Sequence, residues 1–181
     1  MKLWLVRHAQ PLVEAGVCYG ASDVAADRAA TQDAAQRLAE ALPTGIRVMA
    51  STLQRCERLA YVLRGLRPDL AYMLEPRLQE MNFGQWELQR WDAIPRAELD
   101  GWTADFDSWR CGGAESVDDF MRRVAAVWDV TRATQQPAVW ITHAGVIRGA
   151  TLLAQGVRRI HRADQWPAAA PAWGQWQLAE I

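Results

Sequence analysis

Five side chains with reactive or strongly hydrogen-bonding groups follow short apolar segments of the chain. They are Arg7, His8, Arg55, Glu80 and His143. Arginine offers forked N–H donors that match phosphate oxygens, and a neutral histidine can attack phosphorus. Nearby guanidinium groups keep such a histidine neutral, while a carboxylic acid can protonate a leaving oxygen and later deprotonate water. The set is therefore suited to phosphoryl transfer, and it requires no metal.

The elements that must position these side chains alternate between strand-like and helix-like patterns. The clearest helix begins at Ser116, a predicted N-cap with Asp119 three residues later, and it buries Val117, Phe120 and Val124 on one face. We predict strands at 2–6, 47–50, 70–74, 138–142 and 176–181, helices within 23–42, 52–64 (ended by Gly65), 116–134 and 146–155, and short helices in the Trp-rich stretch 86–110.

Strands that alternate with helices predict an α/β fold of layers around a mostly parallel central sheet. In open sheets of this kind, ligands bind beyond the carboxyl ends of the strands. The segments 2–6, 47–50 and 138–142 end next to His8, Ser51 and His143. We therefore expect the five reactive side chains to face one crevice.

Length and composition limit the other possibilities. The 181 residues predict one domain, 1–181, with half of its residues hydrophobic, which excludes a disordered chain. Twenty basic and twenty-one acidic residues argue against a nucleic-acid partner. The sequence shows no apolar run long enough for a membrane span and no secretory signal. Because the sequence shows no signal and no disulfide pattern, we expect a cytoplasmic protein. We expect no metal and no cofactor, since cysteine clusters and glycine-rich nucleotide loops are absent.

Four segments, in the same order along the chain, resemble motifs of the histidine phosphatase (phosphoglycerate mutase-like) superfamily. Leu5-Val6-Arg7-His8-Ala9 resembles its Arg-His-Gly motif, and Ser51-Thr52-Leu53-Gln54-Arg55 resembles Ser-Pro-Leu-x-Arg. Leu78-Gln79-Glu80 and Phe83-Gly84-Gln85-Trp86-Glu87 resemble Leu-x-Glu…Phe-Gly-x-Trp-Glu, and Thr142-His143-Ala144-Gly145 resembles Thr-His-Gly-Gly. The resemblance implies a three-layer α/β/α fold and a metal-independent phosphomonoesterase that acts through phosphohistidine.

The resemblance also assigns roles to individual residues. It implies that His8 is the nucleophile, that Glu80 is the proton donor, and that Arg7, Arg55 and His143 bind the phosphate. Neighbouring Glu75 and Glu87 remain alternative proton donors.

Within the superfamily, the segment 16–24 resembles alpha-ribazole phosphatases, which contain Gly-x-Cys-Tyr-Gly-x-x-Asp-Val. The stretch 112–116 resembles their Gly-Gly-Glu-Ser turn with one residue inserted. This second resemblance implies substrate contacts at Tyr19, Gly20 and Ser22 and a small phosphorylated metabolite, alpha-ribazole 5′-phosphate from cobalamin lower-ligand assembly, as substrate.

Four positions depart from the family patterns. Ala9, Thr52 and Leu88 replace a glycine, a proline and a glycine, and Glu14 stands where many members have asparagine. A carboxylate repels phosphate, so either Glu14 points away or the phosphate site is formed differently. Ala9 is compatible with the loop if its φ is negative.

Three other functions remain open from the sequence. A mutase of the phosphoglycerate mutase type, or a broad-specificity sugar or nucleotide phosphatase, would use the same histidine. A phosphate-binding module without catalysis would keep the fold but not the turnover. The sequence leaves the oligomeric state open.

Overall fold

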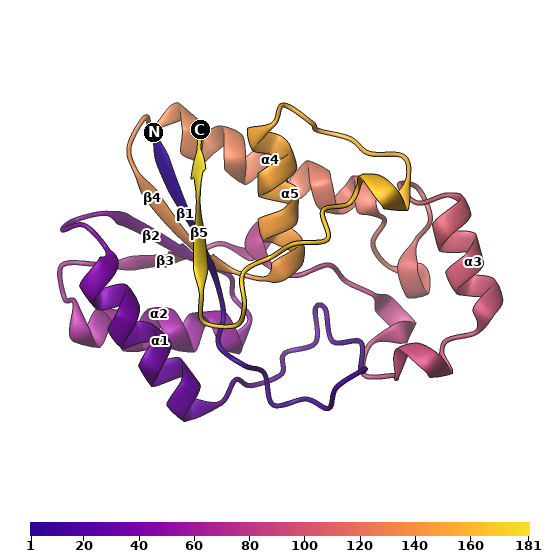
Figure 1. Ribbon diagram of the computed structural model, residues 1–181, viewed down its shortest axis with the longest axis horizontal. Helices are drawn as coiled ribbons and strands as arrows, with labels where there is room; N and C mark the ends of the chain where they lie inside the picture. Colours follow the sequence, from indigo (N-terminus) through magenta and orange to yellow (C-terminus); the bar gives the residue numbers. More distant parts are fainter.

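The computed structural model describes the whole chain, Met1–Ile181. Its centre is a five-stranded sheet in the order β3-β2-β4-β1-β5 (Figure 1). The strands are β1 (Lys2–Arg7), β2 (Arg47–Ala50), β3 (Tyr72–Leu74), β4 (Ala138–Thr142) and β5 (Trp176–Glu180). The strands β1 to β4 are parallel to one another, and β5 is antiparallel to β1. The predicted α/β fold with a mostly parallel central sheet is confirmed.

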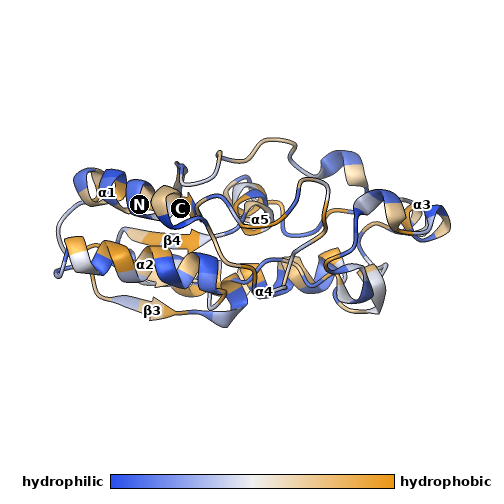
Figure 2. Cartoon of the chain, turned by 90° about the horizontal axis from the view of Figure 1, so that it is seen from below, coloured by the Kyte–Doolittle hydropathy of each residue, from blue (hydrophilic) through white to orange (hydrophobic).

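Helices cover both faces of the sheet. The helices α1 (Arg28–Ala41) and α2 (Gln54–Leu66) share one apolar core with Val48 and Ile141. On the other face, α4 (Val117–Ala133) and α5 (Ala144–Ala154) share a second core with Leu5 and Trp140. All five residues of β4 are buried, and this central strand is orange in Figure 2. The result is the three-layer α/β/α arrangement.

Local signals explain where several helices begin and end. The Ser116 hydroxyl accepts a hydrogen bond from the Asp119 N–H at 3.1 Å and caps α4 as predicted. Asp27 caps α1 in the same way, so α1 begins later than the predicted segment. Gly65 lies inside α2, which continues to Leu66, so the prediction that this glycine ends the helix is wrong. A glycine in a helix costs only about 1 kcal/mol.

The Trp-rich stretch forms short helices, as predicted. The helix α3 (Arg96–Ala104) and several 3₁₀ turns build an extension at the end of the molecule away from α1 and α2 (Figures 1 and 2). Aromatic rings hold this extension together; Trp91 and Trp102, for example, are stacked with ring centroids 6.4 Å apart. The extension therefore has an aromatic core beyond the edge of the sheet.

Candidate active site

The register of the parallel strands brings the carboxyl ends of β1, β2 and β4 together at one edge of the sheet. The backbone N–H of His8 donates to the Thr142 carbonyl at 3.0 Å, and that of Ser51 donates to the Ile141 carbonyl at 2.9 Å. These bonds continue the ladders of β1 and β2 against β4. His8 and Ser51 therefore flank His143, the residue that follows β4.

His8 is buried and neutral, and one of its ring nitrogens is hydrogen-bonded to the backbone. Its Nδ1 lies 2.7 Å from the Ala9 carbonyl, which can only accept a hydrogen bond, so Nδ1 carries the proton. The lone pair is then on Nε2. Burial, followed by the charges of Arg55 and Arg7, lowers the pKa of His8 from 6.5 to about 3. The imidazole is therefore neutral near neutral pH, which is the protonation state that a nucleophilic histidine requires.

His143 packs against His8, with the ring centroids 5.2 Å apart. Its Nε2 lies 2.9 Å from the Ser51 hydroxyl, and the Cys56 thiol lies behind the ring, 3.5 Å from the same nitrogen. Burial and the charge of Arg55 lower the pKa of His143 well below its usual value. Two neutral imidazoles therefore stand side by side at the end of the sheet.

Arg7 and Arg55 bring positive charge to these histidines. Arg55 is fully buried and donates to the carbonyls of Gly20 and Ser22 at 2.6 and 2.7 Å. Arg7 donates to the Pro171 carbonyl at 2.9 Å. The partners are carbonyls rather than carboxylates, and the buried Nε of each arginine has no partner. Buried cations without a counterion favour an anionic ligand.

Glu80 is held by the helix that follows His143. Its Oε2 accepts the Gly145 N–H at 2.9 Å, and its Oε1 accepts the Met81 N–H at 3.0 Å. A Cβ atom on Gly145 would lie 2.2 Å from the carboxylate, so a larger residue here would displace the Glu80 side chain. Arg123 donates to the Glu80 carbonyl at 3.0 Å and fixes the loop from α4.

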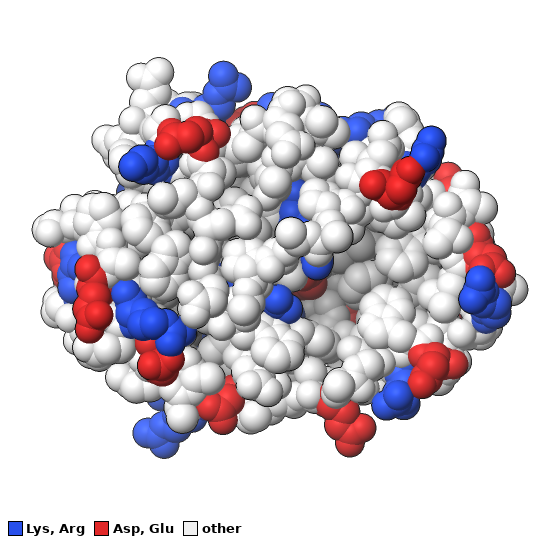
Figure 3. Space-filling model, in the orientation of Figure 1, with Lys and Arg blue, Asp and Glu red and all other residues white.

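These groups line one cavity of about 150 Å³, referred to below as the charged cavity. Figure 3 shows a hollow near the centre of this face, with basic side chains at its margin and acidic atoms within it. Of the predicted site residues, the cavity brings together Arg7, His8, Tyr19, Gly20, Arg55, Glu80 and His143.

Ser22 does not line the charged cavity. Its hydroxyl donates to the Glu87 carboxylate, and its carbonyl accepts from Arg55. Gly20, by contrast, lies so close to the Met81 carbonyl that a Cβ atom would be 1.9 Å from it. Ser22 therefore supports the wall of the cavity, and a direct contact with substrate stays a prediction for Tyr19 and Gly20.

The structure distinguishes the three candidate glutamates. The Glu87 carboxylate accepts hydrogen bonds from the N–H groups of Ala21, Ser22 and Phe83 at 2.8 to 3.0 Å. Glu75 pairs with Arg77, which lowers the pKa of that carboxyl. Only Glu80 of the three lines the charged cavity.

The departures from the family pattern leave the cavity intact. Glu14 is exposed and does not line the cavity, so the first of the two alternatives for this residue holds. Ala9 is not among the residues with positive φ, as its compatibility requires, whereas Leu88 has a φ of 62°. Thr52 accepts a hydrogen bond from the side-chain amide of Gln79.

Sequence reasoning missed several residues around the site. Val17, Phe83, Trp91 and Ala144 complete the lining of the charged cavity. Arg123 holds the Glu80 loop by bonds to the carbonyls of Gln79 and Glu80. Phe83 lay within a recognised motif, so its position was available as a signal. Arg123 carried no signal for this role, because the Gln79 and Glu80 carbonyls that it binds lie more than forty residues away along the chain.

The structure shows neither a metal-binding cluster nor a membrane-spanning helix. No group of three or more His, Cys, Asp or Glu side chains is arranged to hold a metal ion. No helix combines the length and the apolar character that crossing a membrane requires. The metal and membrane expectations stay predictions.

Comparison with known proteins places this geometry in a family. The model of the histidine phosphatase superfamily (branch 1) matches residues 3–170. The chain belongs to this superfamily, and the match identifies it as a phosphatase-type enzyme. A comparison with curated proteins finds no match.

Solved structures share the fold over nearly the whole chain. The alpha-ribazole phosphatase from Shigella flexneri is 22% identical, with a TM-score of 0.83 over 100% of this chain and 91% of its own. A mycobacterial glucosyl-3-phosphoglycerate phosphatase is 21% identical, with a TM-score of 0.79 over 98% and 88%. The protein TTHB049 from Thermus thermophilus is 28% identical, with a TM-score of 0.73 over 98% and 92%. The fold is thus that of phosphatases with different substrates.

Proposed function

We propose that this chain is a metal-independent phosphomonoesterase that acts through a phosphohistidine on His8. The observation that carries the proposal is the neutral, buried His8, with its proton on Nδ1, beside two arginines whose partners are not carboxylates. A phosphate dianion in the charged cavity would supply the counterion that Arg7 and Arg55 lack. Its phosphorus would then lie within reach of the His8 lone pair.

The first step transfers the phosphoryl group to the enzyme. The Nε2 atom of His8 forms a bond to phosphorus while the ester P–O bond breaks. The leaving oxygen takes the electron pair of that bond and a proton from the Glu80 carboxylic acid. Arg7, Arg55 and His143 donate hydrogen bonds to the equatorial oxygens, where negative charge is spread in the transition state.

The second step releases phosphate. A water oxygen attacks phosphorus, its proton moves to the Glu80 carboxylate, and the P–N bond breaks. The electron pair of that bond returns to Nε2 of His8, so the enzyme regains its starting protonation state. Glu80 therefore acts first as acid and then as base, as microscopic reversibility requires.

Trapping of the intermediate tests this function. Acid-quench experiments with labelled substrate should give an acid-labile label on the wild-type chain. His8→Ala should lower kcat by several orders of magnitude, because the phosphoryl group loses the acceptor atom to which it is transferred. An acid-stable label, or near-normal turnover in His8→Ala, would contradict the assignment.

Chelation and vanadate test the absence of a metal. We expect turnover to survive a strong chelator and to be blocked by vanadate, which resembles the pentacoordinate transition state. Loss of turnover in chelator, with recovery on addition of one divalent metal, would show that the arginines do not supply the necessary charge.

Alpha-ribazole 5′-phosphate is the proposed substrate, and its product would serve in cobalamin lower-ligand assembly. The support is the segment Gly16 to Val24 and the fold shared with the Shigella flexneri enzyme. The mycobacterial neighbour acts on a different phosphate ester, so the fold does not select the substrate. A panel of phosphate esters tests this: alpha-ribazole 5′-phosphate should give the highest kcat/KM, and a higher value for a sugar phosphate would contradict it.

A further inference from the structure

The Ser51 hydroxyl is a buried polar group that the proposed mechanism does not use. Ser51 follows β2 and is fully buried, and its Oγ lies 2.9 Å from Nε2 of His143. The same Oγ accepts a hydrogen bond from the Leu53 N–H at 3.3 Å. Ser51 does not line the charged cavity, whereas His143 does. Any effect of this hydroxyl on a bound phosphoryl group must therefore pass through the His143 ring.

The Ser51 hydroxyl proton has one strong acceptor close to it. A hydroxyl group has one proton to donate and two lone pairs, and the Leu53 N–H occupies one of these lone pairs. The strong acceptor is Nε2 of His143, while the neighbouring Cys56 sulfur is a weak one. If Nε2 itself carried a proton, the buried hydroxyl proton would be left with the sulfur alone, which is costly. We therefore infer that Ser51 donates and Nε2 accepts.

The Cys56 thiol is the other polar group behind the ring. Its Sγ lies 3.5 Å from Nε2 and 3.9 Å from Nδ1 of His143, and 3.4 Å from the Thr142 carbonyl. Burial raises the pKa of this thiol, so it stays protonated, and the carbonyl is the stronger of its acceptors. Cys56 therefore offers both ring nitrogens only weak contacts and does not decide which of them is protonated.

The single proton of His143 then lies on Nδ1. Burial and the charge of Arg55 hold the pKa of His143 well below its usual value, so the ring carries one proton and not two. Nδ1 has only the long sulfur contact, so its N–H is available to an acceptor in the charged cavity. The opposite tautomer would present a lone pair at Nδ1, which would repel a phosphate oxygen.

We propose that Ser51 is a positioning residue whose hydroxyl fixes His143 in the Nδ1-protonated tautomer, the form that donates a hydrogen bond to the phosphoryl group. The inference rests on the proposed phosphomonoesterase function, because that function makes His143 a phosphate donor. Both histidines of the site then carry their proton on Nδ1. His8, set by the Ala9 carbonyl, keeps a lone pair for phosphorus, and His143, set by Ser51, keeps a donor for oxygen.

Nitrogen-15 NMR of the three histidines measures the tautomer directly. Protonated and unprotonated ring nitrogens have well separated shifts, and spectra of His8→Asn and His161→Gln assign the His143 signals by elimination. We expect wild-type His143 to show a protonated Nδ1 and an unprotonated Nε2. In Ser51→Ala, Nε2 has lost its donor, so both tautomers should be populated. A wild-type His143 that is protonated on Nε2 would overturn the inference, whether or not the chain hydrolyses any ester.

Cys56→Ala is the matched control, because it removes the other polar group behind the ring. Its His143 should have the same tautomer as the wild type. Ser51→Thr keeps the hydroxyl and should restore the Nδ1-protonated form. If Cys56→Ala changes the tautomer and Ser51→Ala does not, the thiol sets the tautomer and the inference is overturned.

Kinetics measure what the tautomer contributes to phosphoryl transfer. Ser51→Ala should lower kcat/KM about tenfold, because only a fraction of the molecules then carry the donor tautomer. The factor should be the same for an alkyl phosphate and for p-nitrophenyl phosphate, since His143 donates to phosphoryl oxygens and not to the leaving group. Ser51→Thr should recover most of the loss. An unchanged kcat/KM in Ser51→Ala, with the tautomer shifted, would overturn the inference and leave the phosphatase intact.

Binding of inorganic phosphate separates this inference from the catalytic proposal. Its Kd is measured by calorimetry and requires no turnover. Ser51→Ala should weaken the binding about tenfold, and Cys56→Ala should not. If no ester is hydrolysed but the tautomer and the phosphate affinity change together in Ser51→Ala, the hydrolytic proposal fails and the role of Ser51 stands. If no ester is hydrolysed and Ser51→Ala binds phosphate as tightly as the wild type, both proposals are overturned.

Discussion

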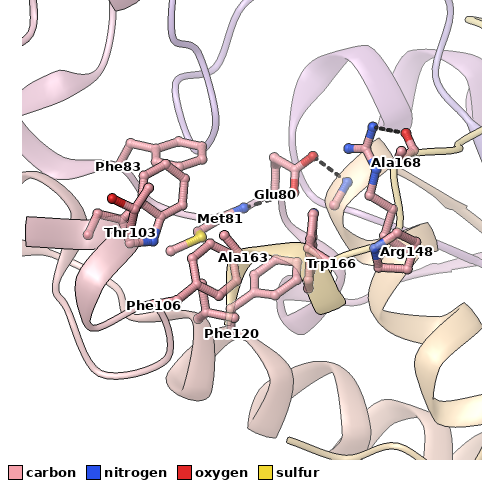
Figure 4. Close-up of a pocket in the computed structure, with 14 residues that line it drawn as sticks. Glu80, Met81, Phe83, Thr103, Phe106, Phe120, Arg148, Ala163, Trp166 and Ala168 are labelled. Carbon is pink, nitrogen blue, oxygen red and sulfur yellow. Dashed lines mark hydrogen bonds between the residues drawn. The ribbon is translucent and has the colours of Figure 1, made fainter. Parts of the chain in front are cut away.

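The charged cavity and a second cavity of about 470 Å³, which we call the aromatic cavity, share a wall, but one is lined by charged and polar groups and the other mainly by aromatic rings (Figure 4). These rings are those of Phe83, Trp102, Phe106, Phe120 and Trp166. The charged cavity buries His8, His143 and Arg55 and is also lined by the half-buried Arg7, so an anion would stabilise its positive charges. A substitution in the aromatic cavity changes apolar contacts and leaves those charges in place. The difference teaches that charge and apolar packing can be changed separately in this molecule, except at Glu80, which lines both cavities.

Glu80→Gln acts on the shared wall and should have the largest effect among substitutions that keep the His8 nucleophile. We expect kcat for an alkyl phosphate to fall about a thousandfold, because an alkoxide must be protonated as it leaves. Hydrolysis of p-nitrophenyl phosphate should fall far less, since its leaving group needs no proton and only the water step loses Glu80. Steady-state kinetics with both substrates measure the difference.

Glu87→Gln is the matched control. Its carboxylate positions the Ala21 and Ser22 segment that accepts bonds from Arg55, so both substrates should lose rate by a similar factor. A leaving-group dependence in Glu87→Gln that is absent in Glu80→Gln would place the proton donor at Glu87.

Arg55→Lys acts on the charged cavity alone. An ammonium cannot reproduce the two bonds to Gly20 and Ser22 together with a forked contact to phosphate, so kcat/KM should fall about 100-fold. The loss should be the same for an alkyl phosphate and for p-nitrophenyl phosphate, because Arg55 binds the phosphoryl group. Arg58→Lys, at an exposed arginine of the same helix, should leave both rates unchanged. If Arg55→Lys slows the alkyl phosphate far more than the aryl one, Arg55 acts through Glu80 and the two cavities are not independent.

The pH dependence of the free energy of unfolding measures how much stability is lost by keeping His8 unprotonated in the charged cavity. His8 is unprotonated when folded, with a pKa of about 3, and binds a proton near 6.5 when unfolded. Since the unfolded chain binds more protons between these values, stability falls as pH drops below 6.5. From pH 7 to pH 5 the contribution of His8 is a loss of about 2 kcal/mol.

Urea unfolding at the two pH values makes this measurement. His143, whose pKa is also lowered, acts in the same direction. Between pH 7 and pH 5, the free energy of unfolding of His8→Asn should fall by about 2 kcal/mol less than that of the wild type. Ala163→Trp, at an exposed residue that lines the aromatic cavity, should lose as much as the wild type. Identical losses in wild type and His8→Asn would show that His8 is protonated in the folded chain.

Leu88→Gly lies outside both cavities and should have the smallest effect. Leu88 has a φ of 62° and an exposed fraction of 60%, so it bears backbone strain without packing in return. Glycine should raise the free energy of unfolding by about 1 kcal/mol and Tm by roughly 2–4 °C, with kinetics unchanged. Leu12→Gly, at an exposed leucine outside the positive-φ region, should not stabilise. A lower Tm for Leu88→Gly would contradict this interpretation.

Several features of the fold followed from residues close together in the sequence. The burial pattern of β4, the Ser116 cap of α4 and the placement of His8 and His143 after parallel strands depend on periodicity, a local hydrogen bond and chain direction. These signals act over a few residues. The layers and most of the charged cavity could therefore be predicted before the structure.

Contacts between residues that are distant in the sequence decided the features that the sequence left open. The sequence favoured Glu80 as proton donor but left Glu75 and Glu87 as alternatives. Tertiary contacts distinguish the three, because only Glu80 lines the charged cavity, where it binds the N–H of Gly145, 65 residues away. The aromatic cavity likewise joins residues 80–120 to 145–168, which share no periodic pattern. The chemical types of the reactive groups are thus fixed by the sequence. Their solvation, tautomer and neighbours are set by tertiary packing, because burial and hydrogen-bond partners depend on segments that are distant along the chain.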